Sequence, residues 1–329
     1  MKHKSASQQA LEMLQKRSLK GLELAKRTIL SEKTMCKEAS EALEYYASYW
    51  ENYTHTGLFS LACEAVGGDP DEAVDVQAAI AMFAGTLDIH DDIIDNSKVK
   101  RGKNTVLGEY GLDTTLILGD IFFVSSFALL NKATVEMPKD KRLEVFATVR
   151  RALLELGNAH ILESALKRKL DVDPECYLQI LRMKAASIEA DTRVGALVGN
   201  GTGKEVEALT RYGRLLGTLV TLREEFIDVF DAKELAHRAR KECLPIPILY
   251  AMKNTKDRKR IQDLIAKKRI AQASANGLVD VVFESENVKK LRKLMRNMVK
   301  QSVSMAQAAH CVKPRSLLLQ LAKATLEDL

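Results

Sequence analysis

Long apolar segments with helical spacing alternate with short polar breaks along most of the chain. The segment at residues 76–94 (VQAAIAMFAGTLDIHDDII) is apolar nearly all round, which predicts a helix buried inside the fold. Four further segments have the same strongly apolar helical pattern, at residues 112–131, 141–170, 174–197 and 204–230. Breaks that are typical of turns separate them, at residues 67–70 (GGDP), 137–140 (MPKD), 171–174 (DVDP) and 199–203 (GNGTG).

Residues 7–33 and 287–305 have amphipathic helical patterns, with lysine and arginine on one side. The chain contains neither an internal repeat nor a linker long enough to separate two domains. We therefore predict an all-α fold, in which residues 1–329 form a single domain: one bundle of long helices around a central cavity.

The composition agrees with this fold and narrows the class of partner. The chain of 329 residues is 46% apolar and 29% charged, which excludes a disordered tail. Its 50 Lys and Arg against 44 Asp and Glu leave a net charge of only +6. The basic run at residues 253–300 contains Phe283 as its single aromatic residue, so we interpret it as a solvated surface. We therefore expect no nucleic-acid partner.

The compartment is predicted from the cysteines and from the missing targeting signals. Five cysteines are scattered without CxxC pairs, which favours reduced intracellular thiols. The first thirty residues lack the apolar core of a signal peptide. The longest apolar run, at residues 121–130, is too short for a spanning helix. We expect a cytoplasmic protein without a transmembrane segment.

Acidic residues end the apolar segment at residues 76–94. In HDDIID (90–95), Asp91 and Asp95 are one helical turn apart, and Asp92 lies beside them. Carboxylates at this spacing repel one another, and burial in an apolar helix adds to the cost. A cation should offset this repulsion, and ligands that are all oxygen favour Mg²⁺ over zinc.

A second acidic group, REEFID (223–228), lies near the end of another apolar segment. Glu224, Glu225 and Asp228 repeat the spacing of the first group. One such group alone is typical of a solvated helix face, but two of them facing each other would hold several Mg²⁺ ions across the cavity. Mg²⁺ held in this way usually completes its ligand shell with water and substrate phosphate oxygens.

Basic residues follow the first acidic group in KRGKNT (100–105), a stretch that is typical of a turn. The spacing places Lys100 and Arg101 beside the metal ions. Cations there would bind phosphoryl oxygens outside the metal shell.

These residues resemble the trans-isoprenyl diphosphate synthases, or polyprenyl synthetases. The first aspartate-rich motif of that family and its flank are similar to HDDIIDNSKVKRGKNTV followed by LGDIFFVSSFALL. ACEAVGGDP (62–70), YLQILRMKAAS (177–187) and KECLP (241–245) also fit the family. The resemblance runs from about residue 61 to residue 252.

The resemblance implies a fold, an activity and further site residues. The fold is the all-α bundle of isoprenoid synthases, usually a homodimer. Mg²⁺ on both acidic groups would bind an allylic isoprenyl diphosphate while its carbon–oxygen bond ionises, with Asp91, Asp92 and Asp95 as the catalytic aspartates. Lys184 matches a lysine that contacts the allylic diphosphate, and Lys241 matches another conserved part of the family pattern. Both would share the charge of the leaving diphosphate with Lys100.

The resemblance also implies where the prenyl chain ends. The pocket floor in this family lies about one turn before the first motif, which here places Thr86 and Leu87 at the floor and Phe83 one turn deeper. Ordinary core packing of Phe83 is the alternative.

The departures from the family pattern concern the pocket for isopentenyl diphosphate. The family's G-K-R-x-R-P stretch is ENYTHT (51–56) here, and an expected histidine is Ala84. Arg101 is the one group for that substrate that is clearly retained. The two aspartates that begin the family's second motif are Glu224 and Glu225, and a preceding Phe-Gln pair is replaced by valine and threonine.

Three hypotheses follow. The first is prenyl transfer, by a divergent synthase acting alone or in a heteromer with a related synthase. The second is a terpene synthase or cyclase on the same fold, which releases pyrophosphate without using isopentenyl diphosphate. The third is a non-catalytic subunit of a hetero-oligomeric prenyl synthase. Retention of all three aspartates disfavours the third, because an unused buried acidic cluster destabilises the fold.

Overall fold

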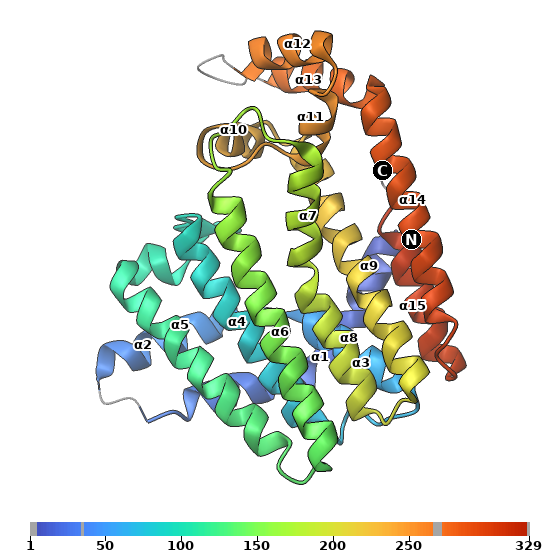
Figure 1. Ribbon diagram of the computed structural model, residues 1–329. Coiled ribbons are helices and arrows are strands. Elements are labelled where there is room, and N and C mark those ends of the chain that lie inside the picture. Colours follow the sequence, from blue (N-terminus) through green and yellow to red (C-terminus); the bar gives the residue numbers. More distant parts are fainter. Residues whose placement is uncertain (1–4, 34–35, 266–271, 328–329) are drawn as a thin grey trace. The chain divides into compact units, whose positions relative to one another are not determined.

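The structure is a computed structural model that describes residues 5–33, 36–265 and 272–327. Within these residues the chain is helical apart from one two-stranded hairpin (Figure 1), which confirms the all-α prediction. The residue contacts divide the chain into two compact units. Unit 1 comprises Met1–Ala147, Asp191–Val206 and Ala309–Pro314, and unit 2 comprises Thr148–Ala190, Glu207–Ala308 and Arg315–Leu329.

The first elements of the chain all belong to unit 1. Their bounds are α1 (Ala6–Leu30), α2 (Lys37–Tyr49), α3 (Tyr53–Ala65), α4 (Val74–Ile94), β1 (Val99–Lys100), β2 (Lys103–Asn104) and α5 (Val106–Ala133). Four helices follow, with bounds α6 (Lys139–Ser164), α7 (Pro174–Lys184), α8 (Ala186–Val198) and α9 (Gly203–Asp228). The remaining helices are α10 (Ala232–Lys241), α11 (Ile246–Ala251), α12 (Thr255–Ile265), α13 (Gln272–Glu284), α14 (Glu286–Ala306) and α15 (Val312–Ala324).

Helix α4 is the centre of unit 1, as its all-round apolar pattern predicts. It packs most extensively against α5 and also against α1 and α3. Met82 on α4, Phe59 on α3 and Phe122 on α5 are fully buried among these helices. Most side chains of α4 are therefore apolar and buried, and most of its carboxylates lie at its C-terminal end.

Helix α5 is longer than the sequence pattern predicts. Thr105 begins it as an N-cap whose side chain accepts a hydrogen bond from the backbone of Gly108, and a kink at Gly111 (φ 79°) interrupts it before the predicted start at residue 112. By length and composition α5 is apolar enough to cross a membrane, but 39% of its most apolar window is buried in the fold. The apolar residues on its other side are exposed: Leu112, Leu116, Ile117 and Val124.

Unit 2 is built around the short helix α11, whose residues are all buried. Helices α7, α13 and α14 pack against it. Asp173 caps the N-terminus of α7, and Asp231 caps that of α10, each by accepting two backbone N–H bonds. These caps set where α10 and α7 start beside the second acidic group.

Two further predicted segments differ from the structure. The segment at 174–197 is two helices, because α7 ends at Lys184 and α8 starts at Ala186. The segment at 141–170 ends at Ser164, since the chain turns there and Arg168 adopts a φ of 64° while its N–H donates to the Glu242 carbonyl. Part of the basic run at 253–300 lies outside the described residues.

Candidate active site

Four carboxylates lie along the C-terminal part of α4. Asp91 and Asp92 are in its last turn, and Asp95 is its C-cap. Asp88, which the sequence analysis missed, lies one turn earlier, and its spacing of four residues from Asp92 would have identified it. The C-terminal end of a helix carries a partial negative charge, so the helix itself adds to the repulsion among these groups.

A lysine from the adjacent hairpin offsets part of this charge. Lys100 at the end of β1 places Nζ 2.5 Å from Oδ1 of Asp92. The hairpin loop is Arg101 and Gly102, which both have positive φ (52° and 77°), as a tight two-residue loop requires. The predicted turn is therefore confirmed, and it brings Lys100 to the aspartates.

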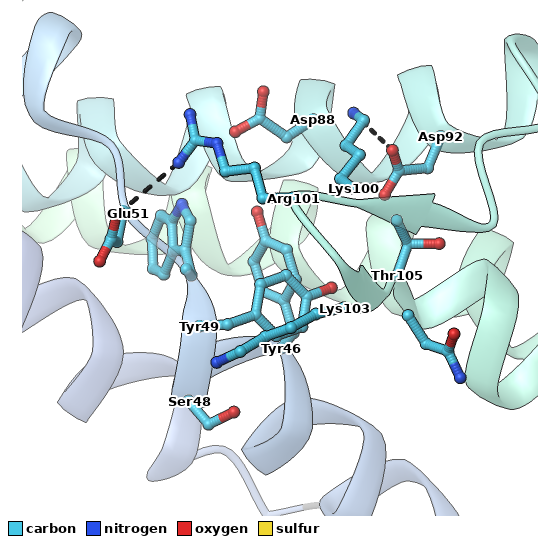
Figure 2. Close-up of a pocket in the computed structure, with 12 residues that line it drawn as sticks. Tyr46, Ser48, Tyr49, Glu51, Asp88, Asp92, Lys100, Arg101, Lys103 and Thr105 are labelled. Atoms are coloured by element: carbon cyan, nitrogen blue, oxygen red, sulfur yellow. Dashed lines mark ion pairs between the residues drawn. The ribbon is translucent and has the colours of Figure 1, made fainter.

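Arg101 takes a different direction from Lys100. Its side chain is 88% exposed, and its Nη1 lies 3.7 Å from Oε2 of Glu51. Figure 2 shows Lys100 directed toward Asp92 and Arg101 directed toward Glu51. The two cations that follow the first motif thus have separate carboxylate partners.

These residues line a pocket of about 360 Å³. Aromatic side chains from the end of α2 and the following residue form one wall, and charged or polar groups of α4 and the hairpin form the other (Figure 2). Its lining consists of Tyr46, Ser48, Tyr49, Trp50, Glu51, Asp88, Asp92, Lys100, Arg101, Lys103, Asn104 and Thr105.

Trp50 is held in this wall by a close approach to α4. A Cβ at position 85 would lie 2.9 Å from the indole ring, so glycine at position 85 is what allows the contact. The indole packs on Tyr46 and against the edge of Phe122. Its N–H is buried and has no hydrogen-bond partner among the described residues, which leaves a donor for a ligand.

The carboxylates facing the pocket have shifted pKa values. The surrounding protein displaces water from Asp88 and raises its pKa to about 6, against the opposing effects of His55 and Lys100. Burial also raises the pKa of Asp92, and the Lys100 ammonium opposes it. Burial lowers the pKa of Lys100, but the ion pair with Asp92 outweighs it and the net shift is upward. Lys100 therefore stays charged beside the aspartates.

His55 has a specific buried partner that the sequence analysis did not foresee. Its Nδ1 lies 2.6 Å from Oδ2 of Asp191 on α8. Burial lowers the pKa of His55, but the Asp191 carboxylate more than offsets this, so the histidine pKa is raised. Thr56 is also buried, and its hydroxyl donates to the Asn52 carbonyl. Both residues are thus tied into unit 1.

The second acidic group lies in unit 2, at the end of α9. Glu225 and Asp228 form ion pairs with the buried guanidinium of Arg238 on α10, at 2.8 and 2.6 Å. Glu224 remains accessible to solvent and makes no side-chain hydrogen bond or ion pair within the described part of the chain. The protein around the Glu224 carboxyl displaces part of its water, and this and the neighbouring Asp228 carboxylate raise the pKa of Glu224 although the residue is exposed.

The two predicted diphosphate-binding lysines of unit 2 differ in their surroundings. Lys184, the last residue of α7, forms an ion pair with Glu163, which also accepts from the Tyr177 hydroxyl at 3.0 Å. Lys241, the last residue of α10, has no side-chain partner among the described residues.

The predicted chain-length residues lie on the buried part of α4. Phe83 is 6% exposed and packs edge-on against Phe127 and Phe123 of α5, with ring centroids 4.8 and 6.2 Å apart. Thr86 is buried, and its hydroxyl donates to the Met82 carbonyl. Leu87 is half-buried. Phe83 therefore belongs to an aromatic cluster.

The α4 carboxylates fit a Mg²⁺ ion that is partly ligated by its substrate. Among the described residues, no three carboxylate, histidine or cysteine side chains are arranged to hold a metal by themselves. Asp92 nevertheless already contacts a cation, the Lys100 ammonium. Mg²⁺ is commonly bound through one or two carboxylates with water and phosphate oxygens completing the shell, and Asp91, Asp92 and Asp95 suit this role.

A family model described as polyprenyl synthetase matches residues 37–282 of the chain. This range contains both acidic groups, the hairpin and both lysines of unit 2.

Similar proteins are prenyl diphosphate synthases by name. The chain is 34% identical over 179 residues to a short chain isoprenyl diphosphate synthase of Methanothermobacter thermautotrophicus, a match that covers 54% of each chain. It is 30% identical over 227 residues to the large subunit 1 of a chloroplastic heterodimeric geranylgeranyl pyrophosphate synthase of Arabidopsis thaliana, covering 64% of this chain and 59% of the relative. The matches thus span little more than half of these relatives.

The fold is similar to that of a solved enzyme over nearly its whole length. The geranylgeranyl pyrophosphate synthetase of Pyrococcus horikoshii matches with a TM-score of 0.86 at 21% identity, covering 98% of this chain and 99% of that one.

Substitution of Asp88 tests the electrostatics of the pocket. Because the pKa of Asp88 is raised to about 6 in the folded protein, the native state binds more protons than the unfolded state between about pH 4 and pH 6. Stability therefore falls as the pH rises through this window, and the full penalty applies above it. We expect Asp88→Asn to raise the melting temperature at about pH 8 and to have little effect at about pH 4, measured in EDTA.

The control is Asp113→Asn, on an exposed part of α5. Its effect on the melting temperature should not depend on pH. An Asp88→Asn effect on the melting temperature that is the same at every pH would contradict the raised pKa of Asp88.

Proposed function

The chain belongs to the polyprenyl synthetase family, as its sequence motifs predict, and on this basis we propose that it ionises an allylic isoprenyl diphosphate and transfers the prenyl group in isoprenoid biosynthesis. The observation that carries this proposal is that Asp88 and Asp92 of the α4 carboxylate group lie in the wall of the pocket, with Lys100 paired to Asp92. A cytoplasmic location is part of the proposal.

In this proposal Asp91, Asp92 and Asp95 of unit 1 hold Mg²⁺. Mg²⁺ at these carboxylates supplies positive charge that stabilises the departing diphosphate. Lys100 exchanges Asp92 for a phosphoryl oxygen, which its half-exposed side chain can reach without leaving the hairpin. Arg101 provides an additional cation for diphosphate oxygens, and the same role for Lys184 and Lys241 stays a prediction from the sequence.

The aromatic wall protects the reacting carbon from water. Tyr46, Tyr49 and Trp50 present ring faces and edges to the pocket, and such faces stabilise a nearby cation. Exclusion of water favours capture of the allylic cation by an organic acceptor over simple hydrolysis.

The residues in the stretch that is expected to bind isopentenyl diphosphate support a second candidate, a terpene synthase or cyclase reaction. In the stretch where the family has G-K-R-x-R-P, Glu51 pairs with Arg101, and His55 is paired with Asp191. These groups do not present unpaired positive charge to a second diphosphate. An intramolecular double bond, or water, would then take the place of isopentenyl diphosphate.

A paired assay separates these reactions. With Mg²⁺, an allylic diphosphate and labelled isopentenyl diphosphate, we expect longer labelled diphosphates to form. Release of pyrophosphate with an extractable hydrocarbon or alcohol, in the absence of isopentenyl diphosphate, would instead show the cyclase-type reaction.

Asp92→Asn should lower turnover by roughly two orders of magnitude or more in either case. The melting temperature should change little, because the loss of the ion pair with Lys100 is offset by weaker repulsion among the α4 carboxylates.

Activity that Asp92→Asn leaves intact would remove Asp92 from the metal site. Inactivity of the wild type in both assays, restored by a co-expressed related synthase, would support the hetero-oligomeric subunit instead.

Phe83→Ala tests the proposed chain-length residues Phe83, Thr86 and Leu87. Removing the ring from the cluster with Phe123 and Phe127 opens space deeper along α4, so we expect longer chains to be accepted or produced. The measurement is product length by mass spectrometry. Because a buried Phe→Ala change costs about 3–5 kcal/mol, Phe83→Leu provides a milder variant. Phe59→Leu, at another buried site, is the control, and an unchanged product spectrum for both Phe83 variants would contradict this floor.

A homodimer is the proposed assembly, with a heteromer as the alternative. The exposed apolar side of α5 supports it, because an exposed apolar patch of this kind commonly marks a protein interface. We expect Ile117→Glu combined with Val124→Glu to give a monomer by light scattering. Val312→Glu, at an equally exposed apolar residue outside α5, should leave the assembly unchanged, and dimers that persist in the α5 variant would rule out this face.

A further inference from the structure

The second acidic group contains a cation of its own, the guanidinium of Arg238. The Arg238 side chain is only 5% exposed. Its Nη1 donates to Oε1 of Glu225 at 2.8 Å and to Oδ2 of Asp228 at 2.6 Å. Its Nη2 donates to the Tyr177 hydroxyl and its Nε to the Cys243 carbonyl, both at 3.0 Å. Each nitrogen of the guanidinium therefore has a protein acceptor.

Of the two carboxylates that contact Arg238, Glu225 is engaged through both oxygens and Asp228 through Oδ2. Oε2 of Glu225 accepts the Ile246 N–H at 2.8 Å, so both oxygens of Glu225 have donors. Glu225 is 8% exposed, and Asp228 is 27% exposed. A metal ion that took these oxygens would leave the buried guanidinium without compensating charge, which is strongly unfavourable.

In both acidic groups a cation offsets the repulsion among neighbouring carboxylates, but the two cations differ in their exposure. At α4 the offsetting cation is Lys100, which is half-exposed and can move away. At α9 the offsetting cation is Arg238, which is buried and fixed by contacts to α7, α9 and the segment after α10. Only the α4 cation can be exchanged for a metal ion at small cost.

We propose that Arg238 replaces a metal ion at the second acidic group, so that Glu225 and Asp228 are its counter-ions and do not bind Mg²⁺. Divalent ions are then bound through the α4 carboxylates, and Glu224 is the carboxylate of the α9 group that forms no ion pair with Arg238. This inference rests on the proposed function, because it assigns the metal ligands of that site. It departs from the sequence prediction, in which both groups bind metal with all six carboxylates.

The test is the number of Mn²⁺ ions bound per chain, measured by titration of the full-length protein together with its melting temperature. Mn²⁺ is the probe because it substitutes for Mg²⁺ at oxygen ligands and its free form is detected by electron paramagnetic resonance. We expect Glu225→Gln and Asp228→Asn to leave the number and affinity of bound Mn²⁺ unchanged within about twofold. Both should lower the melting temperature, by roughly 5–10 °C, because Arg238 loses a buried partner.

Asp228→Asn is the informative variant if Glu225→Gln does not fold, because Asp228 is less buried and makes a single contact with Arg238. The loss of a bound Mn²⁺, or a weakening of at least tenfold, in either folded variant would overturn the proposal. Glu224→Gln, on the same turn of α9, is the matched control and should not lower the melting temperature.

Asp92→Asn distinguishes this proposal from the proposed function itself. Its expected result is loss of Mn²⁺ binding at an unchanged melting temperature. If Asp92→Asn still binds Mn²⁺ normally, the proposed metal site at α4 is wrong. The results for the Glu225 and Asp228 variants do not affect that conclusion.

Discussion

Repulsion among the carboxylates at the end of α4 is the constraint on which the site depends. Asp88, Asp91, Asp92 and Asp95 share the C-terminal part of a helix that is mostly apolar and buried, and the helix dipole adds to the repulsion among them. The fold supplies Lys100 from a tight hairpin, and its ammonium pairs with Asp92. In the proposed function, a divalent ion that arrives with an anionic substrate offsets the remaining negative charge.

The pocket beside these groups combines two opposite environments. Glycine at position 85 lets the Trp50 ring approach α4, and the ring in turn packs with Tyr46 and Phe122, so one wall is aromatic and rigid. The facing wall carries Lys100, Arg101, Asp88 and Asp92. A substrate with a charged head and an apolar tail suits such a pair of walls, which connects the geometry with the chemistry of the family.

The two acidic groups have the same residue spacing and different surroundings. At the first, the partner is a flexible lysine five residues beyond the motif in a loop whose shape Gly102 permits. At the second, Arg238 reaches back from the next helix and is closed in by Tyr177 and the Cys243 carbonyl. The helical period accounts for the shared spacing, but it does not distinguish an exchangeable cation from a fixed one.

The sequence by itself determined the fold class, the family, the approximate bounds of α1, α4, α9 and α14, and the position of the first acidic group on α4, because these depend on local periodicity and on contiguous motifs. Asp88 has the same helical spacing, four residues before Asp92, but it was not among the predicted site residues. The break at residue 185, the His55–Asp191 pair and the role of Arg238 were decided by the tertiary structure alone. Each depends on which buried polar groups meet across helices, and the chain separation of 136 residues between His55 and Asp191 leaves no local pattern to read.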